Sequence, residues 1–200
     1  MEKEPEFSRT DSLATIQEMI NVAKNRFGEN GHLYLVWGWV VFICSLGQFV
    51  LDYFVHYSKP WVVWTLCWGV FIYQVIYLMR KHRQNKVRTY TGDIVGYVWL
   101  VFVILMFLFI FLFRYMLGNE ADKVIGPVLL ALYGMPTFLS GIILRFKPLR
   151  LGGIGCWILS ILSVFVNDKF GILLLSVAMA MAWIIPGYLL RSKYRKEAQA

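Results

Sequence analysis

The sequence predicts an all-α polytopic membrane protein with six transmembrane helices in three hairpins, preceded by a cytoplasmic amphipathic helix. Hydrophobic residues make up 58% of the 200 residues and charged residues only 16%, whereas soluble domains carry about 25% charged residues. The apolar residues are gathered in long blocks, and the net charge of +8 is concentrated in the short segments between them. That distribution is typical of a chain in a bilayer and not of a nucleic-acid-binding face, so we expect no nucleic-acid partner.

The chain begins with an acidic tail, residues 1–9, that we expect to be disordered. Residues 10–31 then show the pattern of an amphipathic helix, which Gly28 and Gly31 are predicted to end. Its apolar side chains recur at helical spacing: Leu13, Ile16, Met19, Ile20, Ala23 and Phe27. We expect this helix on the cytoplasmic side, where its apolar stripe lies on the headgroup layer or packs under the bundle.

Six apolar blocks form the predicted transmembrane domain, residues 32–190. Each has about 18 to 21 residues, enough at ~1.5 Å per residue to cross a hydrocarbon core of ~30 Å. The fifth block is opened by Gly152, Gly153 and Gly155, and a tilted or partly re-entrant segment is the alternative there. The blocks lie near residues 33–51, 61–79, 94–113, 124–144, 149–166 and 170–190.

The basic residues predict the orientation of the spans. Sixteen of the 20 lysines and arginines fall in the N-terminal segment, the second and fourth connections, and the basic tail 191–200. Lysine and arginine are enriched in cytoplasmic loops, so we expect both termini in the cytoplasm. Short outer connections then make blocks 1–2, 3–4 and 5–6 antiparallel hairpins.

A polar stripe in the first block is the first candidate ligand site. Cys44, Gln48 and Asp52 follow one another at helical spacing, and a polar stripe within a span should face other helices or water. One interpretation is a polar site or ion path. The other is that Gln48 makes an interhelical hydrogen bond while Asp52 reaches the outer surface.

The second block predicts an aromatic face. Trp64, Trp68, Phe71 and Gln74 are candidates for an inward surface, with Gln74 as the polar group of an aromatic-lined cavity. Aromatic packing and anchoring at the membrane interface explain most of the same residues.

The fourth block contains Pro136, which lacks an N–H and is expected to kink the helix. The hydroxyls of Thr137 and Ser140 are close enough to bond nearby carbonyls, and Gly134 and Gly141 allow another helix to approach. Broken helices of this kind line sites in transporters, but they are also common as packing kinks. We expect Pro136 in the bundle interior, near Cys44 and Gln48.

The basic connections are the predicted contacts with anionic lipid headgroups, where each cation near the surface contributes about 1 kcal/mol. A cytoplasmic protein is an alternative partner for the same surface. The residues of this set are Arg80, Lys81, Arg83, Arg145, Lys147 and Arg150.

No cofactor, metal site or catalytic set is expected. Cys44, Cys67 and Cys156 each lie inside an apolar block without CxxC spacing, which favours small packing residues over metal ligands. The chain contains no HExxH, GxSxG or P-loop pattern.

Two stretches carry a resemblance. Residues 23–39 (AKNRFGENGHLYLVWGW), and residues 133–141 (YGMPTFLSG) followed by Cys156 and Trp157, resemble a group of small uncharacterised multi-pass membrane proteins of Bacteroidetes-type bacteria. The resemblance covers nearly the whole chain and implies a bacterial inner-membrane location. That group has no established activity, cofactor or site residue.

Two functions are therefore expected from the sequence. The first is a non-enzymatic regulatory or interaction role at the inner membrane. The alternative is a small transporter or channel with a polar cavity among spans 1, 2 and 4. Because a 200-residue chain encloses only a narrow path, transport would favour a homo-oligomer.

Overall fold

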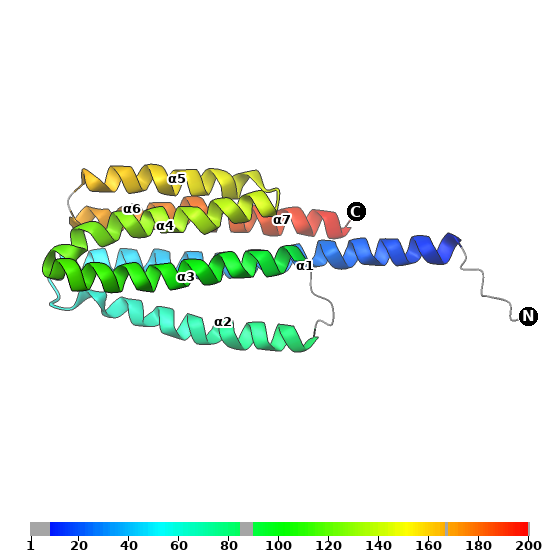
Figure 1. The fold of residues 1–200 in the computed structure, drawn as a ribbon, viewed down its shortest axis with the longest axis horizontal. Helices are drawn as coiled ribbons and strands as arrows, with labels where there is room; N and C mark the ends of the chain where they lie inside the picture. Colours follow the sequence, from blue (N-terminus) through cyan, green and yellow to red (C-terminus); the bar gives the residue numbers. More distant parts are fainter. Residues whose placement is uncertain (1–8, 85–89, 167, 200) are drawn as a thin grey trace, which may run out of the picture.

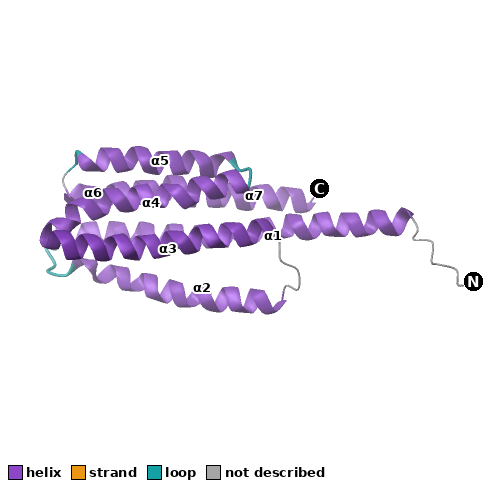
Figure 2. Cartoon of the chain, viewed as in Figure 1, coloured by secondary structure: helices purple, strands orange, loops and turns teal. Residues whose placement is uncertain are grey.

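The computed structural model describes residues 9–84, 90–166 and 168–199, with side chains described for 31–80, 92–166, 170–193 and 196. Every regular element in these residues is helical, which confirms the all-α prediction (Figures 1 and 2). The elements are α1 (Arg9–Tyr53), η1 (Pro60–Trp64), α2 (Thr65–Gln84), α3 (Tyr90–Leu117), η2 (Gly118–Glu120), α4 (Ala121–Ile143), α5 (Lys147–Val164), α6 (Asp168–Met179), η3 (Ala180–Ile184) and α7 (Ile185–Gln199).

Helix α1 is one continuous helix of 45 residues, and the prediction that Gly28 and Gly31 end a separate N-terminal helix is wrong. A glycine inside a helix costs only about 1 kcal/mol, so it weakens a helix without stopping it. Gly31 lies against α7, where a Cβ would be 3.5 Å from the carbonyl oxygen of Gly187. The N-terminal part of α1 extends beyond the bundle (Figure 1). The apolar side chains predicted for residues 10–30 and the tail at residues 1–8 lie outside the description.

The last helical segment also runs further than predicted. The chain is helical from Asp168 to Gln199, so the predicted tail 191–200 is helical over most of its length. A π-helical turn, η3, ends two residues before Pro186. Proline leaves a carbonyl of the preceding turn without its usual donor, and a wider π turn is one way in which helices accommodate such a break.

The helices run antiparallel in a bundle (Figure 1), and they pack unequally. Helices α4 and α5 form the most extensive pair, while α1 packs on α6, η3 and α7, and α3 packs on α4. Among the described elements, α2 has close backbone contacts only with α1 and η1.

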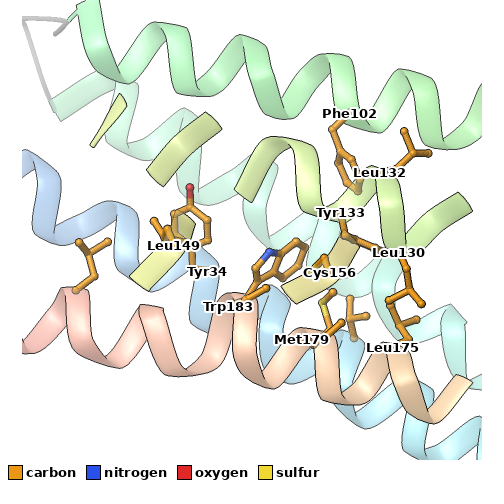
Figure 3. Packing of buried hydrophobic residues seen from close by; sticks show 14 of the residues in the cluster. Tyr34, Phe102, Leu130, Leu132, Tyr133, Leu149, Cys156, Leu175, Met179 and Trp183 are labelled. Atoms are coloured by element: carbon orange, nitrogen blue, oxygen red, sulfur yellow. The ribbon is translucent and has the colours of Figure 1, made fainter. Parts of the chain in front are cut away.

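The core lies among α1, α4, α5 and the α6–α7 segment, with α3 adding Phe102 (Figure 3). Trp183 lies near its centre, with ring centroids 5.3 Å from Tyr133 and 5.2 Å from Trp99.

Five stretches are long and apolar enough to cross a membrane. One of them, Gly92–Ile143, has 52 residues and contains α4 and all of α3 except its first two residues. The fifth predicted block is a full helix, α5, and not a partial one. The stretches are Gly31–Tyr53, Pro60–Arg80, Gly92–Ile143, Lys147–Val164 and Phe170–Lys193.

Candidate functional site

The polar side chains predicted to form a stripe on α1 bond across to η1 and α2. The indole N–H of Trp64 donates to the amide oxygen of Gln48. The indole N–H of Trp37 donates to Gln74 Oε1 at 2.6 Å, and Cys44 Sγ donates to the Val63 carbonyl at 3.3 Å. The structure therefore brings Cys44, Gln48 and Gln74 to one helix interface, where their polar atoms take part in interhelical bonds.

Of the other two residues predicted beside them, Trp68 lies elsewhere. Asp52 is half-buried near the end of α1. Trp68 is 63% exposed, so the prediction that it lines an inward face is wrong, and Phe71 is exposed as well. The partly covered face of α2 is formed by Cys67, Val70, Gln74 and Tyr77, which recur at helical spacing. Trp68 and Phe71 follow Cys67 and Val70 by one residue, which turns each about 100° away from this face.

Thr137 lies at the centre of a fully buried polar contact. Its hydroxyl accepts a hydrogen bond from the Trp183 indole N–H at 2.9 Å and donates to the Tyr133 carbonyl at 2.8 Å. The prediction that Thr137 bonds a nearby carbonyl is thus confirmed. Ser140 differs, because its buried hydroxyl makes no such bond to a carbonyl of α4. The two side chains are about one helical turn apart.

Pro136 is buried, as predicted, but its neighbours differ from those expected. It lines an apolar groove between α3 and α4 together with Phe102 and Leu132. Helices α1 and α4 make no close backbone contact in the described residues, so the predicted proximity to Cys44 and Gln48 is wrong. The reason is that α3, α5 and η3 cover the small-residue faces of α4.

Gly134 and Gly141 face α5, as the small-residue pattern indicates. A Cβ on Gly134 would be 2.9 Å from the Gly153 carbonyl oxygen, and one on Gly141 would be 2.6 Å from the Arg150 nitrogen. The two helices approach this closely because neither glycine has a side chain.

Several buried contacts were not predicted. Ser45 and Ser176 share a hydrogen bond of 2.6 Å between α1 and α6, and the Trp99 indole lies 3.3 Å from the Tyr34 hydroxyl. Ser45 follows Cys44 by one residue, and Ser176 lies among small residues of the sixth block. Their hydroxyls are a signal in sequence, but only the packing of α1 against α6 brings them together.

The two ends of the bundle differ in charge. At one end Arg114 pairs with Asp122 at 2.7 Å, and Lys123 pairs with Glu120 at 2.5 Å. The opposite end carries Arg80, Arg145 and Lys147, all exposed, and the half-buried Arg150. The side chains of Lys81 and Arg83, predicted at the same end, lie outside the described residues.

The turn between α4 and α5 presents two of these cations. The Phe146 N–H donates to the Gly141 carbonyl at 2.9 Å and the Arg145 N–H to Ile142 at 3.0 Å, which together close α4. Arg145 has φ of +50°, a left-handed conformation that glycine usually occupies at this position. Arg150 donates from Nε to the Gly141 carbonyl at 3.0 Å.

The described residues bring no three His, Cys, Asp or Glu side chains together in a way that could hold a metal ion. Comparison with protein-family models, with curated proteins and with solved structures finds no match to this chain.

Proposed function

We propose that this chain is a six-span protein of a bacterial inner membrane, with both termini in the cytoplasm. It has a non-enzymatic regulatory or interaction role, and the basic end of the bundle, which carries Arg80, Arg145 and Lys147, contacts anionic lipid headgroups. Counting Gly92–Ile143 as two crossings supports six spans, because 52 residues are more than twice the length that one crossing needs.

The observation that carries the proposal is the charge asymmetry of the bundle. At one end, the cations Arg114 and Lys123 are each paired with a carboxylate, and Lys59 is exposed. At the other end, Arg80, Arg145 and Lys147 are exposed. Unequal distribution of lysine and arginine sets the orientation of membrane proteins, and the cytoplasmic leaflet is anionic. Both rules favour the basic end in the cytoplasm.

Interaction is favoured over transport by the state of the predicted polar stripe. The amide oxygens of Gln48 and Gln74 accept bonds from Trp64 and Trp37, so both groups have a structural role at the α1–α2 interface. The groove beside Pro136 is apolar, which suits a hydrocarbon and not an ion path.

Thiol labelling in spheroplasts tests the orientation. In a background with Cys44, Cys67 and Cys156 replaced by alanine, cysteines at Glu120 and Lys169 should react with a membrane-impermeant maleimide. A cysteine at Gln84 should react only after permeabilisation. The reverse pattern would refute the proposed orientation and with it the contact between the basic end and cytoplasmic lipid.

A further inference from the structure

The groove between α3 and α4 is open on its outer side. Its volume is about 380 Å³, within the range of about 300–1,000 Å³ that ligand pockets occupy. Phe102, Leu132 and Pro136 are buried and form its floor, whereas Tyr97 and Val101 are 67% and 51% exposed at its edge. A groove with this lining favours a hydrocarbon chain.

The length of the groove matches one leaflet. Its lining residues on α3 run from Ile94 to Leu105, which is about 16 Å at the rise of an α-helix. The hydrocarbon core of a bilayer is about 30 Å thick, so the groove spans about half of it. Because Ile94 lies two residues from the start of the apolar stretch at Gly92, this half is the one at the basic end.

A cationic corner lies beyond the basic end of the groove. Met135 and Leu139 line the groove on α4, and Ile142 continues the same helical stripe to the end of that helix at Ile143. Arg145 lies in the turn that follows. Next to Arg145, the exposed Lys147 begins α5.

The electrostatics of this corner favour an anion. Helix α5 has no side-chain N-cap and no acidic residue in its first turn, so the positive end of its dipole adds to the charges of Arg145 and Lys147. Asp93, in the first turn of α3, is an exposed carboxylate at the same end of the bundle, and it offsets one of the two cations.

We propose that the α3–α4 groove binds one anionic glycerophospholipid of the cytoplasmic leaflet. One acyl chain lies along Phe102, Leu132 and Pro136, and the phosphate lies at Arg145 and Lys147. The inference rests on the proposed function, since it uses the cytoplasmic orientation of the basic end.

The test uses the full chain in nanodiscs of phosphatidylcholine that contain a trace of phosphatidylglycerol with a photoreactive diazirine near the end of one acyl chain. The expected result is crosslinking to α3 and α4 near Leu105 and Leu132, mapped by mass spectrometry. The same probe with a phosphatidylcholine headgroup should crosslink about tenfold less, because two cations favour the anionic headgroup.

Two pairs of variants separate the groove from the surface in general. Met135→Trp fills the groove and should abolish crosslinking, whereas Ile158→Trp, on the exposed side of α5, should leave it unchanged. Arg145→Gly combined with Lys147→Gln should lower crosslinking about tenfold, and Arg191→Gln combined with Lys196→Gln should have little effect. Glycine suits the left-handed conformation at position 145, so this variant is expected to fold at least as well as the original chain.

The proposal is overturned if Met135→Trp crosslinks as the unchanged chain does, or if the label lies mainly on helices other than α3 and α4. Equal losses from both pairs of cation variants, with Met135→Trp unaffected, would refute the groove and leave the general contact with headgroups standing. Equal crosslinking by both headgroups in every variant would refute the headgroup contact of the proposed function as well.

Discussion

Two neighbouring helix pairs in this bundle are held together in different ways. Helices α4 and α5 approach so closely that a single methyl group on Gly134 would meet the Gly153 carbonyl oxygen at 2.9 Å. Trp157 and Ser160 on α5 also donate hydrogen bonds to α4 carbonyls. By contrast, the membrane stretch of η1 and α2 has no buried residue, and it meets α1 through a few polar and aromatic contacts.

The difference follows from which residues face the neighbour. Apolar side chains gain little from leaving lipid for protein, so helices in a membrane associate through close backbone packing and polar bonds. The glycines of α4 and α5 allow close backbone packing. Helix α2 is held instead by the polar bonds of Gln48 and Gln74, and its glycine, Gly69, has no atom within 4 Å of the position of an added Cβ. We therefore expect α2 to be held less firmly against α1 than α4 is held against α5.

The largest effect is predicted at Gly134. A Cβ there would lie 2.5 Å from the Trp157 indole nitrogen and 2.9 Å from a backbone oxygen that cannot move without shifting α5. Gly134→Ala should therefore lower the free energy of unfolding by about 1–3 kcal/mol, the usual cost of overpacking a closely packed site. Thermal unfolding of the detergent-solubilised protein measures it.

Gly96→Ala is the matched control, because it changes a helical glycine of α3 where no atom lies within 4 Å of the added Cβ and no proline follows. Its stability should stay the same or rise by up to about 1 kcal/mol, the difference in helix propensity. If both variants lose stability equally, close packing of α4 on α5 is not what makes this pair firm.

A smaller loss is predicted at Thr137, which joins α4 to the π turn of the last helical segment. Thr137→Val keeps the shape of the side chain but leaves the buried Trp183 N–H without its acceptor. The expected loss is about 1–2 kcal/mol, since an orphaned buried donor costs more than the net value of its bond. Intrinsic tryptophan fluorescence should also change.

Ser163→Ala serves as the comparison for that variant, because the Ser163 hydroxyl bonds only a carbonyl three residues earlier in its own helix. Its effect should be within about 0.5 kcal/mol. A Thr137→Val protein as stable as Ser163→Ala would mean that the Trp183 contact contributes nothing.

The sequence was sufficient for the helical class and for the positions of the apolar blocks, because both depend on local composition. It was also sufficient for the role of Gly134 and Gly141, since small residues seven apart lie on one helix face. The continuity of α1 was not predictable in this way: a glycine pair ends a helix only if nothing else holds the helix together, and Gly31 packs on α7.

The candidate site was harder to predict for a related reason. Helical spacing groups Cys44, Gln48 and Asp52 on one face of the first block, but it does not say which of their atoms have partners. The place of Pro136 depends on α3, whose residues 101–113 are aliphatic or aromatic on every side of the helix. The groove forms only where α3 packs on α4, and its lining residues on the two helices are more than 25 positions apart in the sequence. Local sequence patterns do not reveal such a pairing.

The smallest effect is predicted for the bonds that hold α2. Gln48→Leu and Gln74→Leu each remove one acceptor of an indole N–H, and such bonds between membrane helices are worth about 0.6 kcal/mol on average. Because α2 has close backbone contacts only with α1 and η1 among the described elements, we expect each loss to be local. Backbone hydrogen exchange over Thr65–Gln84 should become faster in each variant and fastest in the double variant, while exchange in α4 and α5 stays unchanged. Leu66→Met is the control, since that side chain is 58% exposed and lies outside the interface, and the change keeps an apolar group toward lipid. If either glutamine variant speeds exchange in α4 and α5 as much as in α2, the two regions unfold as one unit, and α2 is not a separately held helix. If neither variant changes exchange anywhere, α2 is held by its aromatic neighbours, and the polar bonds contribute nothing measurable to its attachment.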